Sequence, residues 1–269
     1  MENLLLPSKV ELLEGSNPNT GSVVITPCYH GYGTTLGNAL RRVLLSSLPG
    51  AAVESFKIKG SQHEFSTVPG IKEDVVEIML NLKQLVVRVY SDDPVVLNIT
   101  KKGAGEVTAK DITKNAQVEI INKDLVLATL TNDRYNLDME IVVGRGRGYK
   151  PVEEKDKHSH DLGTIMIDSI YTPVRDVGYV VEYTRVGDIT NYEKLTVNIE
   201  TNGTITPADA LRQSVQILTD HFNIVMDAAN QAPVATAPET VVATESVENT
   251  SVENVDEEEK TKKKAKKKS

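Results

Sequence analysis

The stretch His30–Gly50, HGYGTTLGNALRRVLLSSLPG, is the part of the chain that decides how the rest is interpreted. It opens with closely spaced glycines, continues as one amphipathic segment and closes on Pro-Gly. Its apolar residues recur at helical spacing: Leu36, Leu40, Val43, Leu44 and, one turn further on, Leu48. The pattern predicts a helix that Thr34 or Thr35 caps and that Pro49-Gly50 ends.

The opposite side of this predicted helix carries an unexpected leucine. At about 100° per residue, the side away from the apolar stripe holds Asn38, Arg41, Arg42 and Leu45. Arginines suit a solvated face, but a leucine among them does not. We therefore expect a helix with two buried faces, one against its own core and one against a partner protein.

Composition limits the classes of protein to which the chain can belong. Its 269 residues are enough for one large or two ordinary domains. A net charge of −8 and only 4% aromatic residues argue against a dedicated nucleic-acid module. The single Cys28 excludes an internal disulfide and a cysteine-cluster metal site. No apolar run approaches the roughly 18 residues of a membrane span, and the start is too acidic for a signal peptide, so we expect a reducing cytoplasm.

Hydrophobic patterning predicts an α+β fold. We expect strands at 22–26 (ended by Pro27), 51–60, 85–90, 95–100, 118–121, 125–130, 137–143, 164–171, 178–186 and 194–200, with a long loop between the last two and a second, shorter helix over 73–85. Strong helices flank a β-rich middle. We therefore expect a discontinuous subdomain of residues 1–50 and 174–230, an inserted subdomain of residues 51–173, and a tail, 231–269, that composition marks as disordered.

A further long helix is predicted after Thr206. Thr206 suits the N-cap, Pro207 the first helical position and Asp209 the third. Steps of four and three then connect an apolar seam: Leu211, Val215, Leu218, Phe222, Val225 and Ala229. A second row runs beside it: Ala210, Ile217 and Ile224. Because this apolar surface is wider than one core needs, we expect part of it to meet another protein.

Catalytic and ligand-binding alternatives are weak. The glycines at 31, 33 and 37 resemble a variant dinucleotide turn, but the candidate ribose acid Glu54 begins its strand instead of ending it, so close packing is the favoured explanation. His158 and His160 lack a third zinc ligand. Arg145 and Arg147 suit either a phosphate contact or a basic hairpin end. We expect no catalytic residue, no cofactor and no metal, and a solvated lysine-rich end.

Five motifs together resemble the α subunit of bacterial-type or plastid-type DNA-directed RNA polymerase. They are GYGTTLGNALRRVLLSSLPG, HEFSTVPGIKEDVVEIMLNLK, GRGRGYKP, YTPV (residues 171–174) and the segment from Leu195 through ETNGTITPADALRQSVQIL. They cover about residues 20–230, which in the family form the amino-terminal assembly domain. Tyr32 and Thr34 stand where the family often has Phe and His. The family usually continues into a carboxy-terminal DNA-binding domain, which we do not expect here.

The resemblance implies a non-catalytic subunit of a nucleotidyltransferase complex that forms a homodimer and assembles the large subunits. It implies bacterial cytoplasm or a plastid, ω and sigma factor in the full complex, and DNA contact only through that complex. Arg42 matches an arginine implicated in β binding, the loop 63–74 would face β, and the strands around 174–186 would lie toward the large subunits, mainly β′. The implied large-subunit contacts are Asn38, Arg41, Arg42, Leu45, His63, Glu64, Ser66, Thr67, Gly70, Asp74, Val174 and Arg175. The implied dimer contacts are Tyr32, Leu36, Leu211, Val215, Leu218, Phe222 and Val225. The alternative function is a free-standing dimeric interaction hub.

Overall fold

The structure, a computed structural model, describes residues 5–155, 162–187 and 189–231. The predicted tail beyond Gln231 and the pair His158 and His160 lie outside these residues. The described residues up to Met226 form one compact unit. Strands in open sheets and three α-helices confirm the predicted α+β class.

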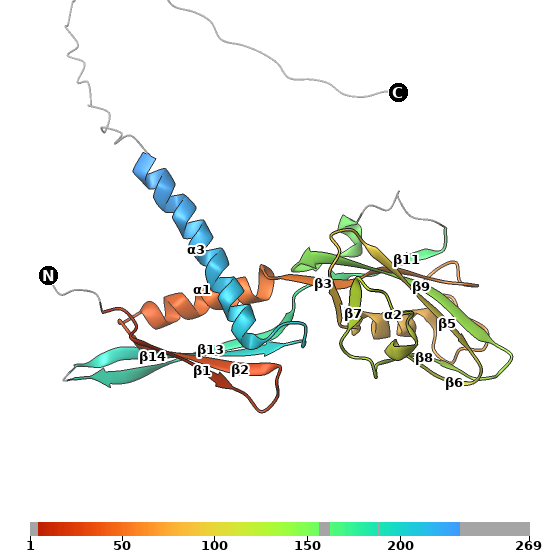
Figure 1. The fold of residues 1–269 in the computed structure, drawn as a ribbon, viewed down its shortest axis with the longest axis horizontal. Coiled ribbons are helices and arrows are strands. Elements are labelled where there is room, and N and C mark those ends of the chain that lie inside the picture. The colour runs from red at the N-terminus through yellow and green to blue at the C-terminus, as the bar shows by residue number, and fades with distance from the viewer. Residues whose placement is uncertain (1–4, 156–161, 188, 232–269) are drawn as a thin grey trace, which may run out of the picture. The chain divides into compact units, whose positions relative to one another are not determined.

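A four-stranded antiparallel sheet joins strands from the two ends of the chain (Figure 1). Its order is β1-β2-β14-β13, with β1 at Lys9–Glu14, β2 at Thr20–Cys28, β13 at Val174–Val186 and β14 at Ile189–Thr201. Val23 of β2 pairs with Val197 of β14, and both side chains are buried. Alternate residues of these strands therefore give the sheet one apolar face.

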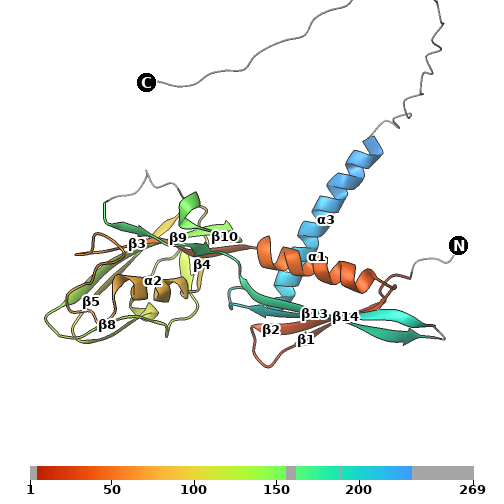
Figure 2. The same cartoon turned by 180° about the vertical axis from the view of Figure 1, so that it is seen from behind.

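Two helices, α1 at Tyr32–Ser46 and α3 at Pro207–Gln231, place apolar residues on that face (Figures 1 and 2). The resulting cluster, the helix–sheet core, has these buried members: Val23, Cys28, Leu40, Leu44, Leu48, Val174, Val177, Leu195, Val197, Ile199 and Ala210. All of them come from residues before 49 or after 173. The core therefore depends on both ends of the sequence.

A second cluster, the central core, draws its buried members from residues 53–167. It lies between α2 (Val75–Lys83) and the sheet β11-β3-β9-β5 with its smaller neighbours. The strands of that sheet are β3 at Pro49–Ile58, β5 at Val95–Lys102, β9 at Asn136–Arg147 and β11 at Thr164–Met166. The two-stranded sheets are β4 (Val87–Val89) with β7 (Val118–Ile120), β6 (Gly105–Thr108) with β8 (Val126–Leu130), and β10 (Tyr149–Lys150) with β12 (Ser169–Ile170). Short 3₁₀ turns cover Ala109–Asp111 and Val152–Glu154.

Several predicted strand boundaries are wrong. β2 continues through Pro27 to Cys28, because the register with β14 shifts there and the missing N–H falls at an irregularity. The loop predicted between β13 and β14 is short, since Val186 pairs directly with Ile189. The strand predicted over 164–171 is divided into β11 and β12, and β6 lies in a region where no strand was predicted.

Candidate protein–protein interface

The inner face of α1 contains two glycines in addition to the predicted leucines. Leu40 and Leu44 are buried, and Gly33 and Gly37 are buried beside them. A Cβ on Gly37 would lie 2.7 Å from the Tyr179 ring and 3.0 Å from Leu195. The glycines therefore let the helix approach the sheet closely, as the sequence favoured. Leu36 and Val43, which belong to the predicted stripe, are only half-buried.

The start of α1 is held by a carboxylate from the other end of the chain. Neither Thr34 nor Thr35 caps the helix: the N-cap is Gly31 at φ 83°, and no side chain of its own caps it. Instead, Glu193 of β14 accepts hydrogen bonds from the backbone N–H groups of Gly31 at 2.8 Å and Gly33 at 2.9 Å. The prediction of a threonine cap is wrong because these donors are satisfied by a residue distant in sequence.

Glu193 occupies the position that a nucleotide phosphate would need at the glycine turn. An anion binds a helix N-terminus through free backbone N–H groups. Here the carboxylate already occupies them, and its side chain is 7% exposed. Nearby, burial, and after it the charge of Glu193, raises the pKa of the Cys28 thiol. The turn is therefore a packing element closed by the chain's own acid.

The outer face of α1 stays open to solvent. Asn38, Arg41 and Arg42 are exposed, and none of the three side chains forms a hydrogen bond or ion pair with another residue that the structure describes. Leu45 differs from the expectation of a fully outward leucine, because it is half-buried and packs against the helix–sheet core. Leu45 therefore lies at the border between the arginine face and the helix–sheet core.

The beginning of α3 matches its predicted cap. The hydroxyl oxygen of Thr206 accepts the N–H of Asp209 at 3.1 Å, and the hydroxyl donates to the Asp209 carboxylate at 2.8 Å. Ala210 is buried, and Leu211, Ile217 and Leu218 pack partly against the helix–sheet core. Among the described residues, the apolar side chains of α3 that pack within the chain lie between Ala210 and Leu218.

Exposed apolar side chains remain on α3: the seam residues Val215, Phe222 and Val225, and Met226 beside them. Exposed fractions are 45% for Val215, 67% for Phe222, 65% for Val225 and 58% for Met226. Ile224 of the second row is 68% exposed. Clustered apolar side chains of this size mark a surface that meets another protein.

Two further residues that were predicted for the dimer contact are on α1. Tyr32 is 44% exposed, and its ring stands edge-on to Tyr29 with centroids 6.3 Å apart. Leu36 packs partly against the helix–sheet core. Both elements with predicted dimer residues thus combine a buried side with an open one.

The loop 63–74 precedes α2 and is fixed at both ends. The hydroxyl of Ser66 donates to the carbonyl of His63 at 2.6 Å, and the carboxylate of Asp74 caps α2 by accepting the N–H of Glu77 at 2.7 Å. His63, Glu64 and Thr67 are exposed, whereas Gly70 is half-buried at φ 82°. Asp74 therefore has a structural task in addition to any partner contact.

One aromatic in this loop was missed at the sequence level. Phe65 is 79% exposed, although a phenylalanine in a polar loop gives no periodic signal. Its neighbours Val68 and Val75 belong to the central core. The large-subunit residues predicted on this loop therefore belong to the region of the central core, whereas those predicted on α1 belong to the region of the helix–sheet core.

Val174 and Arg175 separate in the structure. Val174 is 1% exposed and belongs to the helix–sheet core, so its side chain does not lie on the surface of the chain. The register of β13 with β14 shifts between Val174 and Asp176, so Val174 stays buried while Arg175, at the irregularity, is exposed. Arg175 alone offers its side chain to a partner.

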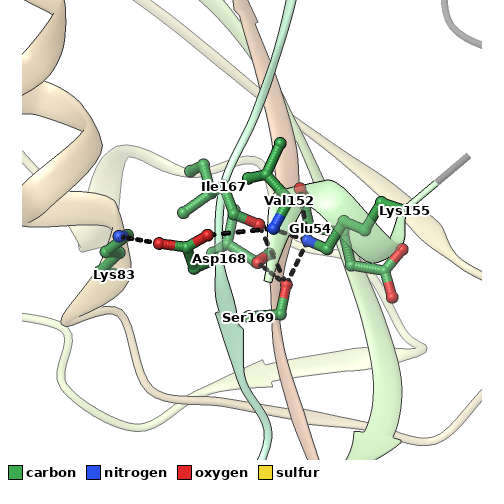
Figure 3. A network of polar contacts seen from close by, with 8 residues as sticks. Glu54, Lys83, Val152, Lys155, Ile167, Asp168 and Ser169 are labelled. Carbon is green, nitrogen blue, oxygen red and sulfur yellow. Dashed lines mark hydrogen bonds and ion pairs between the residues drawn. The ribbon is translucent and has the colours of Figure 1, made fainter. Parts of the chain in front are cut away.

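A buried polar network beside β3 was also not predicted (Figure 3). The ammonium of Lys155 donates to the carbonyl of Glu54 at 3.0 Å, to the hydroxyl of Ser169 at 2.6 Å and to the carbonyl of Ile167. Three donors thus meet three acceptors. Burial lowers the pKa of Lys155. Every contact is internal, so the network holds the chain after β10 against β3 and β12.

Arg145 and Arg147 do not sit at a hairpin end. Both lie in β9, whose pairing with β3 extends to Arg147 opposite Pro49. Arg145 forms an ion pair with Asp92 at 2.8 Å, which weakens the phosphate alternative at that position. The described residues contain no group of three His, Cys, Asp or Glu side chains arranged for a metal. Nor is any helix in this part of the chain long and apolar enough to cross a membrane.

α1 has an exposed arginine-rich face and α3 an exposed apolar face, and both helices pack on a sheet made of strands from the two ends of the chain. Such exposed faces are typical of a protein-interaction subunit. Residues 56–172 match the family model described as the RNA polymerase Rpb3/RpoA insert domain. The chain is 55% identical over 218 residues to the DNA-directed RNA polymerase subunit alpha of Desulforamulus reducens, which covers 80% of this chain and 69% of that relative. It is 49% identical over 225 residues to the protein of the same name from Oceanobacillus iheyensis, covering 83% and 71%. The chain belongs to the DNA-directed RNA polymerase subunit alpha family.

Proposed function

We propose that this chain is the assembly subunit of the polymerase: it forms a homodimer through α3 and the start of α1, and the dimer collects the β and β′ subunits. The observation that carries the proposal is the uncovered seam of α3, where Phe222 and Val225 are each about two-thirds exposed. A second copy with the same seam supplies a self-complementary cover, as a two-fold interface requires.

The dimer is tested by placing a charge in the seam. Phe222→Asp leaves the folded monomer intact, because this side chain does not belong to the helix–sheet core. It would bury an unpaired carboxylate in the dimer, which costs several kcal/mol. Sedimentation should then report a monomer. The matched control is Asn223→Asp, one residue away on the polar side of the helix, which should remain dimeric.

Binding of the large subunits is assigned to the outer face of α1, centred on Arg42. Its guanidinium is exposed and has no described partner, so it can enter a bidentate pair with a carboxylate of a partner. Arg42→Ala should leave the dimer intact and weaken capture of purified β. Arg134→Ala removes an equally exposed arginine far from α1 in sequence and should change nothing. A monomeric Arg42→Ala protein would show that the faces of α1 are wrongly assigned.

We assign the remaining predicted contacts with the same logic. The exposed loop residues His63, Glu64 and Thr67, with Ser66, Gly70 and Asp74, face β, whereas Arg175 and the strand after it face the large subunits, mainly β′. Residues 1–50 and 174–230 form the dimerisation subdomain and residues 51–173 the insert, in keeping with the separate membership of the two cores.

The chain itself performs no chemistry in this proposal, and ω and sigma factor join only in the full cytoplasmic complex. A free-standing interaction hub is the rival, which family membership disfavours. Purification of the native protein separates the two. The assembly subunit should travel with two very large chains, and a dimer that travels alone would overturn the proposal.

A further inference from the structure

The surface on the outer side of α1 does not end with the helix. The last turn of α1 lies next to the strand end at residues 147–150 (Figures 1 and 2). A Cβ on Gly148 would lie 3.3 Å from the carbonyl oxygen of Ser46, and the hydroxyl of Ser46 donates to the carbonyl of Arg42 at 2.8 Å. Arg147 pairs with Pro49, three residues after the helix ends. Helix and strand end are therefore neighbours.

Glycines explain why the chain can turn here. Gly148 has φ 64°, a left-handed conformation that suits glycine, and it separates β9 from β10. A Cβ on Gly146 would lie 2.8 Å from the Tyr171 ring. Gly146 therefore lets the inner side of the strand pack closely against Tyr171, and Arg147, between the two glycines, is exposed on the outer side.

The short pair β10–β12 presents two apolar side chains to solvent. Tyr149 lies opposite Ile170, and the two are 59% and 54% exposed. The neighbouring pair is Lys150 and Ser169, of which Ser169 is buried and donates to the carbonyl of Val53 at 2.7 Å. Because side chains alternate along a strand, Ser169 turned inward places Ile170 and Tyr149 outward together.

We propose that Tyr149 and Ile170, with Arg147, extend the Arg42 face of α1 into one continuous binding surface for the β subunit. The inference rests on the proposed function, since Arg42 defines the partner. Arg147 is exposed and without an ion-pair partner among the described residues, unlike Arg145. Tyrosine and arginine are the side chains that most often dominate protein interfaces. The partner surface that fits is an apolar recess bordered by carboxylates.

The test uses the full-length chain as a dimer and purified β. Tyr149→Ser combined with Ile170→Ser should weaken β binding about tenfold or more, as removal of two interface anchors does. The matched control is Tyr90→Ser combined with Val96→Ser, which removes a tyrosine and a β-branched residue of similar exposure, 60% and 51%. The control should bind β within about twofold of the parent chain.

Folding is checked by the melting temperature and dimer mass of each variant. A second pair, Tyr149→Thr with Ile170→Thr, keeps side chains that favour β-strands and must weaken β binding as well. A photo-crosslinking residue at position 149 should attach to β, and the same residue at position 90 should not.

Four results would overturn the inference. The first is normal β binding by both double variants while Arg42→Ala weakens it, which would leave the proposed function standing. The second is weakened β′ binding with β binding unchanged. The third is weakened β binding by the double variants with Arg42→Ala without effect, which would separate the two surfaces. The fourth is DNA binding that Arg147→Ala abolishes while β binding is unaffected. Loss of dimerisation in Phe222→Asp tests the proposed function alone.

Discussion

Removal of the Glu193 carboxylate should destabilise the chain, because that group accepts two backbone N–H groups at the N-terminus of α1. Glu193→Ala leaves two backbone N–H groups without an acceptor. That of Gly33 is buried, so water cannot replace the 2.9 Å bond, whereas Gly31 is exposed. A hydrogen bond to a charged group contributes about 1.5–3 kcal/mol, and the wet one contributes less. We expect a total loss of about 2–4 kcal/mol.

The measurement is urea unfolding followed by circular dichroism. Protein concentration must be held fixed, because the proposed dimerisation makes apparent stability depend on it. Glu193→Gln keeps one acceptor oxygen and loses the charge, so it should lie between the parent and Glu193→Ala. The control is Glu200→Gln on the same strand, where the side chain is exposed and a change within about 0.5 kcal/mol is expected.

A loss below about 1 kcal/mol in Glu193→Ala would refute the reasoning, since it would mean that the helix N-terminus does not need this acceptor. Equal losses in Glu193→Ala and Glu200→Gln would refute it as well, because the effect would then be one of net charge. The same experiment bears on assembly: α1 carries Tyr32 and Arg42, so a frayed start should weaken dimerisation before it weakens β capture.

Three other predictions follow from local geometry. Gly37→Ala should cost about 1–3 kcal/mol in urea unfolding, because its Cβ would meet the Tyr179 ring at 2.7 Å, whereas Gly178→Ala meets open space and should be neutral. The hydrogen bond from Lys83, and then that from the Val152 N–H, lowers the pKa of Asp168, so its contribution to stability is present above the unfolded-state pKa of about 3.9 and is lost as pH falls through the folded-state pKa. Urea midpoints of Asp168→Asn should therefore depend less on pH between about pH 6 and pH 2 than those of the parent. Cys28, fully buried with a raised thiol pKa, should react with a disulfide reagent only on unfolding, and fast labelling of the native chain would contradict its placement.

How much the sequence predicts depends on whether the deciding interaction is local. The cap of α3 is predicted because Thr206, Pro207 and Asp209 are adjacent, and each role follows from position alone. The cap of α1 is not, because Glu193 lies 160 residues from Gly33 and no pattern connects them. Tertiary contact overrides local preference in the same way at Pro27, where a register irregularity accepts a residue that usually ends a strand.

Face assignment follows the same division. The sequence predicts that α1 has two faces and that its glycines allow close packing, but it places the inner face by apolar residues, so it does not show that Gly33 and Gly37 belong to that face. Leu45 and Val174 show the opposite case, since an apolar residue close to a predicted partner face also packs into the core beneath it. Residue type was therefore enough to locate the candidate surfaces. The register of the sheet was needed to decide which residues at the borders of these surfaces are buried.

The position of Glu193 also constrains the order in which the interfaces can form. The central core takes its buried residues from 53–167, so its contacts are available as soon as that segment exists. The helix–sheet core and the cap of α1 both need β14, and the seam that we propose for the dimer follows later still, on α3. Contacts between distant segments form slowly because the intervening chain must first close. The N-terminus of α1 should thus become capped, and the Arg42 face reach its final position, only when β14 pairs within the sheet. This step should follow the folding of the insert. Pulse-labelling hydrogen exchange during refolding should protect the amide of Ile141 before that of Gly33, and the reverse order would contradict this sequence of events.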